Sequence, residues 1–256
     1  MTSLRSEWTI VDGTRIHARV SQRQHDRGLP VVVLVHGLSV SSRYLVRLGD
    51  RLAGDHEVLV PDLPGFGLSD KPSSALDMPA LAAVLERWLD ARGAGRVVLA
   101  GHSLGCQIAI RMAARSPERV GALALLAPTV DPAARSITGQ AARLLRDAVR
   151  EPIPLVAIQL RDYLRTGLRR SLQTLRFAVA DEPERQLAQL RMPALVVSGG
   201  RDPIVSPTWA ATVARLLPDG RLATIEGAAH AMPYSAPERC AALIRELVIG
   251  VASRRL

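Results

Sequence analysis

The sequence predicts an α/β fold, in which helices bury a parallel sheet on both faces. Short runs rich in Val, Leu and Ile recur along the chain, and a segment with apolar residues at helical spacing follows most of them. Continuous apolar runs of this length are typical of strands that are buried on both faces. Pro and Gly stand at nearly every junction between the runs, where they favour turns.

The order of these runs gives the expected order of the elements. Two antiparallel strands are predicted first, near residues 8–11 and 15–20. Buried strands are then predicted at residues 31–35, 57–60, 96–100, 120–126, 194–198 and 221–226. Helices are predicted at residues 44–53, 78–92, 104–115, 208–217 and 237–251, because apolar residues recur there at intervals of three and four.

The alternation of strands and helices stops between residues 131 and 192, where no Val-rich strand is found. This segment instead has the pattern of several amphipathic helices, such as 140–150 and 155–165. We therefore expect an insertion that divides the core in two. The predicted boundaries are 1–130 for the first part of the core, 131–191 for the helical insertion and 192–256 for the second part.

The chain is strongly basic, and the insertion carries much of that charge. Its 256 residues have a formal net charge of +9, and Lys71 is the only lysine among 33 basic residues. Residues 133–191 hold 11 Arg against 6 acidic residues, a balance of +5. Nucleic-acid-binding proteins group basic residues into a stripe with aromatic residues between them, whereas the aromatic residues here are few and scattered. We therefore expect no nucleic-acid partner, and we favour a solvated helical face over a dedicated anion site as the role of these arginines, although the sequence leaves anion binding open.

The composition is that of an ordinary globular protein, with 48% hydrophobic and 22% charged residues. No apolar run approaches the roughly 20 residues that cross a bilayer, and residues 1–7 lack the apolar stretch of a signal peptide. The sequence thus predicts a soluble, cytoplasmic protein without an integral membrane segment. Cys106 and Cys240 form neither a metal motif nor a disulfide framework, and we expect reduced core residues.

A Gly-x-Ser-x-Gly motif lies between a predicted strand and a predicted helix. It reads Gly101-His102-Ser103-Leu104-Gly105 and directly follows the strand at 96–100. A nucleophile elbow requires this context, because the tight turn has no room for side chains at the two glycines and exposes the serine hydroxyl. The sequence therefore predicts that Ser103 is a nucleophile. The N–H of Leu104, at the start of the helix, is expected to stabilise negative charge beside it.

A serine hydroxyl needs a base to take its proton and a carboxylate to orient that base. His230 lies in a loop of small residues after the last predicted strand, and Asp202 follows the strand before it. Because the carboxyl ends of parallel strands meet at one sheet edge, Ser103, Asp202 and His230 are expected to lie close together. Asp131 follows another strand and is the rival acid, although Pro132 beside it favours a turn.

The second donor of an oxyanion hole is expected from the loop after the strand at 31–35. Gly37 allows the backbone to turn inward there, and the N–H of Leu38 is the predicted donor. His36 is predicted to hold this loop by hydrogen bonds to the backbone, and His102 is predicted to be a packing residue. No cluster of His, Cys, Asp and Glu has metal-ligand spacing, so no metal site is expected.

These motifs together resemble the α/β-hydrolase superfamily. The resemblance implies an eight-stranded, mostly parallel sheet flanked by helices, a helical lid at 131–191 over the active site, and catalysis without a cofactor. Cys106 departs from the pattern, since relatives often have glycine there, and its side chain is expected to pack behind the elbow. The segments that carry the resemblance are His36-Gly37, Pro-Asp-Leu-Pro-Gly-Phe-Gly-Leu-Ser at 61–69, Gly-His-Ser-Leu-Gly at 101–105, Gly-Gly-Arg-Asp-Pro at 199–203 and Gly-Ala-Ala-His at 227–230.

The favoured function is hydrolysis of a carboxylic ester through an acyl-enzyme on Ser103. A small, moderately hydrophobic ester is the expected partner, because the insertion has apolar helix faces that would surround it. The superfamily includes many chemistries, so the resemblance alone selects no substrate. The apolar residues expected to shape the substrate site are Leu155, Val156, Ile158, Leu160, Leu164 and Phe177.

Other functions stay open on the same fold. Relatives that hydrolyse a carbon–carbon bond of diketone ring-cleavage products use the same triad but commonly have Trp after the catalytic His, where this chain has Ala231. A ligand sensor with very slow turnover would also keep the triad, and a membrane-surface protein would use the basic insertion. Dehalogenase and epoxide hydrolase relatives use an aspartate nucleophile, so Ser103 argues against both. The sequence determines neither the acyl chain length nor the oligomeric state.

Overall fold

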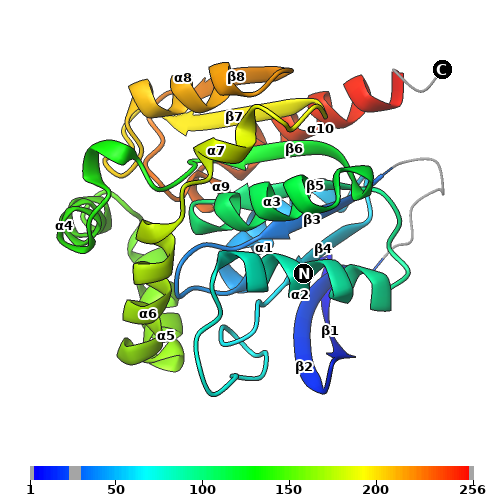
Figure 1. Cartoon of the computed structure of the whole chain (residues 1–256), viewed down its shortest axis with the longest axis horizontal. Helices are drawn as coiled ribbons and strands as arrows, with labels where there is room; N and C mark the ends of the chain where they lie inside the picture. Colours follow the sequence, from blue (N-terminus) through cyan, green and yellow to red (C-terminus); the bar gives the residue numbers. More distant parts are fainter. Residues whose placement is uncertain (1–2, 23–29, 254–256) are drawn as a thin grey trace.

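The computed structural model describes residues 3–22 and 30–253 and has one sheet in that part of the chain (Figure 1). Its eight strands lie in the order β1-β2-β4-β3-β5-β6-β7-β8, and helices cover both faces. The predicted α/β fold class is therefore confirmed. The strands are β1 (Leu4–Val11), β2 (Thr14–Ser21), β3 (Val31–Val35), β4 (Val58–Pro61), β5 (Val97–His102), β6 (Val120–Leu126), β7 (Ala194–Gly199) and β8 (Gly220–Ile225).

The sheet is parallel except at one edge. There β1 pairs antiparallel with β2, and β2 pairs antiparallel with β4. The other neighbouring strands pair in parallel. Every residue of β5, β6 and β7 is buried, which explains why these strands are continuous apolar runs rather than alternating ones.

Helices outside the insertion form a layer on each face of the sheet. Figure 1 shows α2, α3 and α8 in front of the sheet, with α1 and α10 behind it. Capping fixes several starts: Asp77 accepts a hydrogen bond from the N–H of Ala80, and Ser206 accepts one from that of Trp209. None of the helices among the described residues is both long and apolar enough to span a membrane. The helices outside the insertion are α1 (Val46–Leu52), α2 (Met78–Ala91), α3 (Leu104–Arg115), α8 (Pro207–Leu216), α9 (Met232–Ser235) and α10 (Pro237–Ser253).

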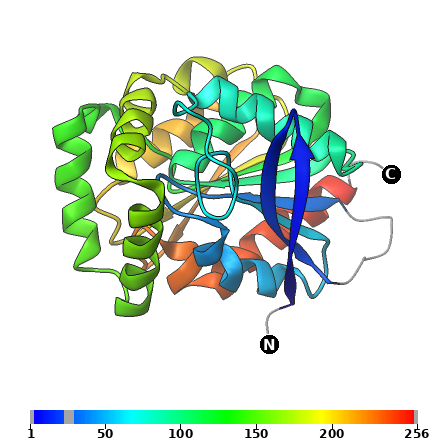
Figure 2. The ribbon, with the colours of Figure 1, turned by 90° about the horizontal axis from the view of Figure 1, so that it is seen from below.

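Between β6 and β7 the chain forms α4 (Ile137–Ala148), α5 (Ile153–Thr166), α6 (Leu168–Ala180) and the short α7 (Glu184–Leu187). We call residues 131–191 the insertion. Figure 2 shows its long helices grouped at the left edge of the molecule, away from the β1–β2 hairpin. Gly167, with φ of 84°, makes the turn between α5 and α6.

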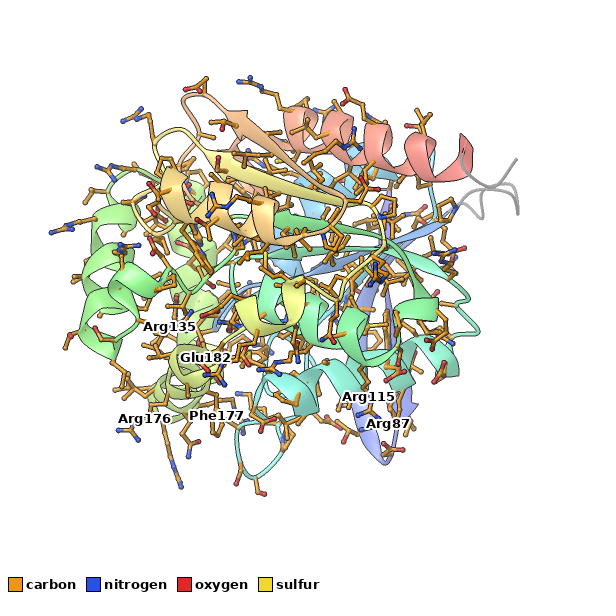
Figure 3. The ribbon with its side chains drawn as sticks, turned by 45° about the horizontal axis from the view of Figure 1, so that its top comes forward. Arg87, Arg115, Arg135, Arg176, Phe177 and Glu182 are labelled. Carbon is orange, nitrogen blue, oxygen red and sulfur yellow. The ribbon has the colours of Figure 1, made fainter. Side chains whose placement is uncertain are left out.

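The two ends of the insertion are joined by ion pairs. A guanidinium nitrogen of Arg135 lies 2.7 Å from a carboxylate oxygen of Glu184 and 3.8 Å from one of Glu182. Figure 3 shows Arg135 and Glu182 close together at this junction.

Several predicted boundaries differ from those observed. β1 begins at Leu4 rather than at residue 8, and α4 covers Ile137–Ala148 rather than 140–150. The predicted helix at 44–53 is a 3₁₀ turn (Ser42–Leu45) followed by α1. Cys106 and Cys240 are buried, free thiols, as predicted.

Candidate active site

Ser103 lies at the turn from β5 to α3, in a backbone conformation that residues other than glycine rarely adopt. Its φ is 56° and its ψ is −121°. The turn requires glycine on both sides, since a Cβ atom at Gly101 would lie 2.4 Å from the carbonyl oxygen of Gly105. A Cβ at Gly105 would lie 2.3 Å from the carbonyl oxygen of Val35 in β3. Backbone contacts this close keep the Ser103 turn in place.

The Cys106 side chain packs behind this turn, as the sequence predicts. Its thiol donates to the carbonyl oxygen of Gly101 at 3.1 Å, and its Sγ lies 3.4 Å from that of Leu126. The side chain is fully buried, and burial raises the pKa of the thiol well above its usual value. Cys106 is thus a neutral packing residue rather than a second nucleophile.

His230 and Asp202 form a buried hydrogen-bonded pair. His230 Nδ1 lies 2.8 Å from Asp202 Oδ2, while Asp202 Oδ1 accepts hydrogen bonds from the N–H groups of Ile204 and Val205 at 2.7 and 3.1 Å. Burial would raise the pKa of Asp202, but His230 and these donors hold it below its usual value. Burial would lower the pKa of His230, but the charge and hydrogen bond of Asp202, with two further acids, raise it to about 8.

The rival acid, Asp131, has a different set of partners. Its Oδ2 lies 2.8 Å from a guanidinium nitrogen of Arg143, and its Oδ1 accepts from the N–H of Ala133 at 2.9 Å. These contacts begin the 3₁₀ turn at Pro132–Ala134 and connect it to α4. Asp131 therefore has the turn role that Pro132 indicates, while Asp202 is the acid bonded to His230.

The loop after β3 packs directly against Ser103. A Cβ atom on Gly37 would lie 3.3 Å from the Cβ of Ser103, and Leu38 and Ser103 line the same small cavity. His36 holds this loop as predicted: its Nδ1 donates to the carbonyl oxygen of Gly37 at 2.8 Å, and its Nε2 accepts from the N–H of Leu63 at 3.0 Å. Burial lowers the pKa of His36, consistent with a neutral ring that donates once and accepts once.

His102, which was predicted only to pack, also forms hydrogen bonds that link two loops of the site. The N–H of Gly37 donates to the Tyr44 hydroxyl at 3.0 Å, that hydroxyl lies 2.7 Å from His102 Nδ1, and His102 Nε2 lies 2.9 Å from the carbonyl oxygen of His230. Burial, with the charge of His230, lowers the pKa of His102 to about 3, so its ring is neutral. The network connects the loop after β3 to the His230 loop. No motif marks Tyr44, because its partners are distant in the sequence.

Two acids of the insertion also reach the His230 loop, and neither was predicted. Asp147 Oδ1 accepts from the backbone N–H of His230 at 3.3 Å, and Glu151 Oε1 accepts from that of Ala231 at 2.7 Å. Burial raises the pKa of both carboxyl groups, that of Glu151 to about 7. In the loop after β3, the hydroxyl of Ser39 donates to the hydroxyl of Ser171 on α6 at 2.8 Å. The insertion therefore contacts both loops beside Ser103.

Two cavities adjoin each other at the insertion. The smaller, of about 50 Å³, is bordered by Ser103, His102 and His230. The larger, of about 360 Å³, is almost wholly apolar. Leu38, Leu144 and Tyr163 line both cavities and stand between them. The larger cavity is lined by Leu38, Leu144, Tyr163, Leu164, Gly167, Leu168, Ser171, Leu172 and Leu175.

The apolar residues predicted to shape the site differ in burial and in whether they line a cavity. Leu164 lines the larger cavity, and Leu155 is fully buried. Leu160 and Phe177 are 60% and 38% exposed and line neither cavity, so the prediction for these two was wrong. The helices carry apolar residues on more than one side, and spacing alone does not show which side faces inward.

The outer surface of the insertion has charges of one sign. Between residues 137 and 180, all of which are described, Asp147, Glu151 and Asp162 are buried, and each exposed charged side chain is an arginine. Exposed apolar residues lie among these arginines, and Figure 3 shows Arg176 beside Phe177 on α6. The exposed arginines are Arg146, Arg150, Arg161, Arg165, Arg169 and Arg176.

Comparisons with known proteins agree with this architecture. The model of the alpha/beta hydrolase family matches residues 32–243. Polyketide synthase ThaQ of Burkholderia thailandensis is 34% identical over 240 residues, which cover 84% of this chain but only 11% of that protein. A pimeloyl-(acyl-carrier protein) methyl ester esterase of Neisseria meningitidis serogroup B is 30% identical over 245 residues, covering 86% of this chain and 93% of the esterase. The structure of a bacterial membrane phospholipase A has the same fold, with a TM-score of 0.83, 24% identity and coverage of 97% and 87%.

Proposed function

The chain belongs to the alpha/beta hydrolase family, and from this premise we propose that it is a serine hydrolase that cleaves a carboxylic ester of a moderately hydrophobic substrate. The observation that carries the proposal is the hydrogen bond between His230 and Asp202, 2.8 Å long, in a site that Ser103 borders. A buried acid-imidazole pair beside an accessible, half-buried serine is the arrangement that activates a hydroxyl as a nucleophile.

The proposed mechanism has two steps. His230 Nε2 takes the proton of Ser103 as its Oγ attacks the ester carbonyl, and the N–H groups of Leu38 and Leu104 hold the resulting oxyanion. The imidazolium then gives its proton to the leaving alkoxide, which departs as the alcohol and leaves an acyl-enzyme. A water molecule deprotonated by His230 attacks this acyl group, and Ser103 recovers its proton as the acid is released. Asp202 keeps the ring in one tautomer and stabilises its cation.

The larger cavity is the proposed acyl site. Its volume of about 360 Å³ lies in the usual range of small-ligand sites, and its wall is apolar. It shares Leu38 with the small cavity at Ser103, so an acyl chain seated in it would have its carbonyl near the proposed oxyanion donors. The insertion is accordingly a lid in this proposal. The esterase named among the relatives acts on a methyl ester, which supports an ester as the substrate class.

The test is a chain-length series of p-nitrophenyl esters with the wild type and Ser103→Ala. We expect sustained nitrophenol release over many turnovers by the wild type, with the highest kcat/KM for acyl chains long enough to enter the apolar cavity. The variant should release none above the rate in buffer. A single stoichiometric burst would instead indicate the slow-turnover sensor, and undiminished release by the variant would contradict the proposed nucleophile.

A further inference from the structure

The His230 loop is held from two sides. On the core side, His102 Nε2 donates to the carbonyl oxygen of His230 at 2.9 Å. On the insertion side, Asp147 accepts from the N–H of His230 and Glu151 accepts from that of Ala231. The peptide groups on both sides of the His230 side chain are therefore fixed by residues from other parts of the chain.

The two acids are costly to bury, because neither forms a salt bridge with an arginine or lysine among the described residues. Asp147 and Glu151 are 4% and 7% exposed, and their hydrogen bonds to the His230 loop are to neutral backbone N–H groups. Glu151 Oε2 is buried without a hydrogen-bond partner in the same part of the chain. A buried carboxylate that lacks a cation destabilises a fold, and such exceptions to the usual rules are typical of functional sites.

We propose that Asp147 and Glu151 are positioning residues, which hold the His230 loop in its reactive conformation and place negative charge beside the imidazole. The proposal rests on the proposed function, in which His230 becomes positively charged each time it takes a proton. The short hydrogen bond to Ala231 fixes the position of the loop. The charges of both acids stabilise the imidazolium, in addition to the effect of Asp202.

The groups that face His230 come from three elements. Asp202 follows β7, His102 ends β5, and Asp147 and Glu151 come from the insertion, where Arg150 lies near Asp147. His102 is neutral, so the acids dominate the field at the ring. Together they raise the pKa of His230 to about 8, although burial opposes the rise. Only the neutral ring accepts a proton, so kcat/KM of the wild type should rise with pH through about 8.

The experiment separates charge from hydrogen bonding. Glu151→Gln keeps an oxygen that accepts from Ala231 but removes the charge, whereas Glu151→Ala removes both. Asp181→Asn and Asp181→Ala are the matched controls, because Asp181 is a buried acid of the insertion that binds Arg111 on α3, away from the His230 loop. Two readouts are used: the pH dependence of kcat/KM with p-nitrophenyl butyrate, and the titration of the His230 ring by NMR with ¹³C-labelled histidine.

In Glu151→Gln, the pH at which kcat/KM reaches half its maximum should fall by about 0.5 unit or more, and the His230 pKa measured by NMR should fall equally. The kcat of this variant should stay within about threefold of wild type. Glu151→Ala should lower kcat by about tenfold or more at nearly unchanged KM, because the ring is displaced from Ser103. The Asp181 variants should keep the wild-type pH profile.

The proposal is overturned if Glu151→Gln leaves both the limb and the ring titration unchanged, or if the Asp181 controls shift them equally. If circular dichroism shows that Glu151→Ala has lost its structure, the pH profile and ring titration of Glu151→Gln alone test the proposal. The NMR titration needs no turnover. A protein that hydrolyses no ester would contradict the proposed function, while a lowered ring pKa in Glu151→Gln would still support the charge effect.

Discussion

The loops around Ser103 and the insertion above them are held by contacts of different kinds. The loops rest on backbone contacts that admit only glycine, as at Gly101 and Gly105, and on buried hydrogen bonds. The insertion consists of amphipathic helices, and some of its apolar side chains lie in water: Val149 and Ile153 are 86% and 84% exposed. Reacting groups require positions fixed to within a fraction of an ångström, whereas an apolar site tolerates repacking. We therefore propose that the loops determine the chemistry and that the insertion determines the choice of substrate.

Removing the base from the loops should have the largest effect. His230→Ala is expected to lower kcat by a factor on the order of 10⁴ to 10⁶, because Ser103 then has no proton acceptor. Asp202→Asn should lower kcat by about 10⁴, since the wrong tautomer of the ring is favoured. The matched change Asp131→Asn should keep kcat within about threefold of wild type. Steady-state kinetics measure all three, and a His230→Ala variant with a tenth of the wild-type kcat would exclude His230 as the base.

A glycine variant tests how rigidly the loops are held. Gly105→Ala places its Cβ 2.3 Å from the carbonyl oxygen of Val35, so β3 or the turn must move. We expect the free energy of unfolding to fall by about 3 kcal/mol. Gly95→Ala is the control, since a Cβ at Gly95 meets nothing within 4 Å. Urea denaturation measures both, and equal stability of the two variants would show that the turn adapts.

A variant of Leu144 tests the proposal that the insertion determines the choice of substrate. It lies between the two cavities, and Leu144→Ala should join them. The ratio of kcat/KM for an octanoyl ester to that for a butyryl ester is expected to rise by about tenfold. Leu145→Ala is the neighbouring control, because Leu145 is 73% exposed and lines neither cavity. An unchanged ratio in Leu144→Ala would argue against the apolar cavity as the acyl site.

The smallest effect is expected on the outer surface of the insertion. Val149→Ala should change the free energy of unfolding by no more than about 0.5 kcal/mol, because the side chain is already in water. The same substitution at Val33 in β3, which is fully buried, should cost about 2 kcal/mol or more. Urea denaturation of both variants compares the two regions directly. A large loss at Val149 would indicate that a partner or a second copy covers this surface.

The sheet could be predicted closely, because its strands are marked by their own sequences. β3 and β6 have the predicted bounds, and α3 begins and ends at the predicted residues, since a glycine turn precedes it and a proline follows it. The pairing of His230 with Asp202 also followed from strand order, because adjacent parallel strands end at one edge.

The contacts between the insertion and the loops could not be predicted in this way. Asp147 and Glu151 bind backbone N–H groups about eighty residues away, and a backbone donor leaves no mark on the sequence. Asp147 lies on α4 and Glu151 in the turn that follows it, and acidic side chains at such positions resemble ordinary solvated residues. Tyr44 and His102 were missed for the same reason, since each acts through a hydrogen bond to a distant segment.

The exposed charges on the outer surface of the insertion, which are all arginines between residues 137 and 180, affect how fast solutes reach it. A surface of one sign raises the local concentration of oppositely charged solutes and increases their diffusional association rate. Amphiphiles with an anionic head group would therefore reach the six exposed arginines faster than cationic ones. Salt weakens this preference, because at physiological ionic strength the field decays over about 8 Å. The arginines thus favour the approach of anionic solutes to the insertion, before the apolar cavity selects among them by shape.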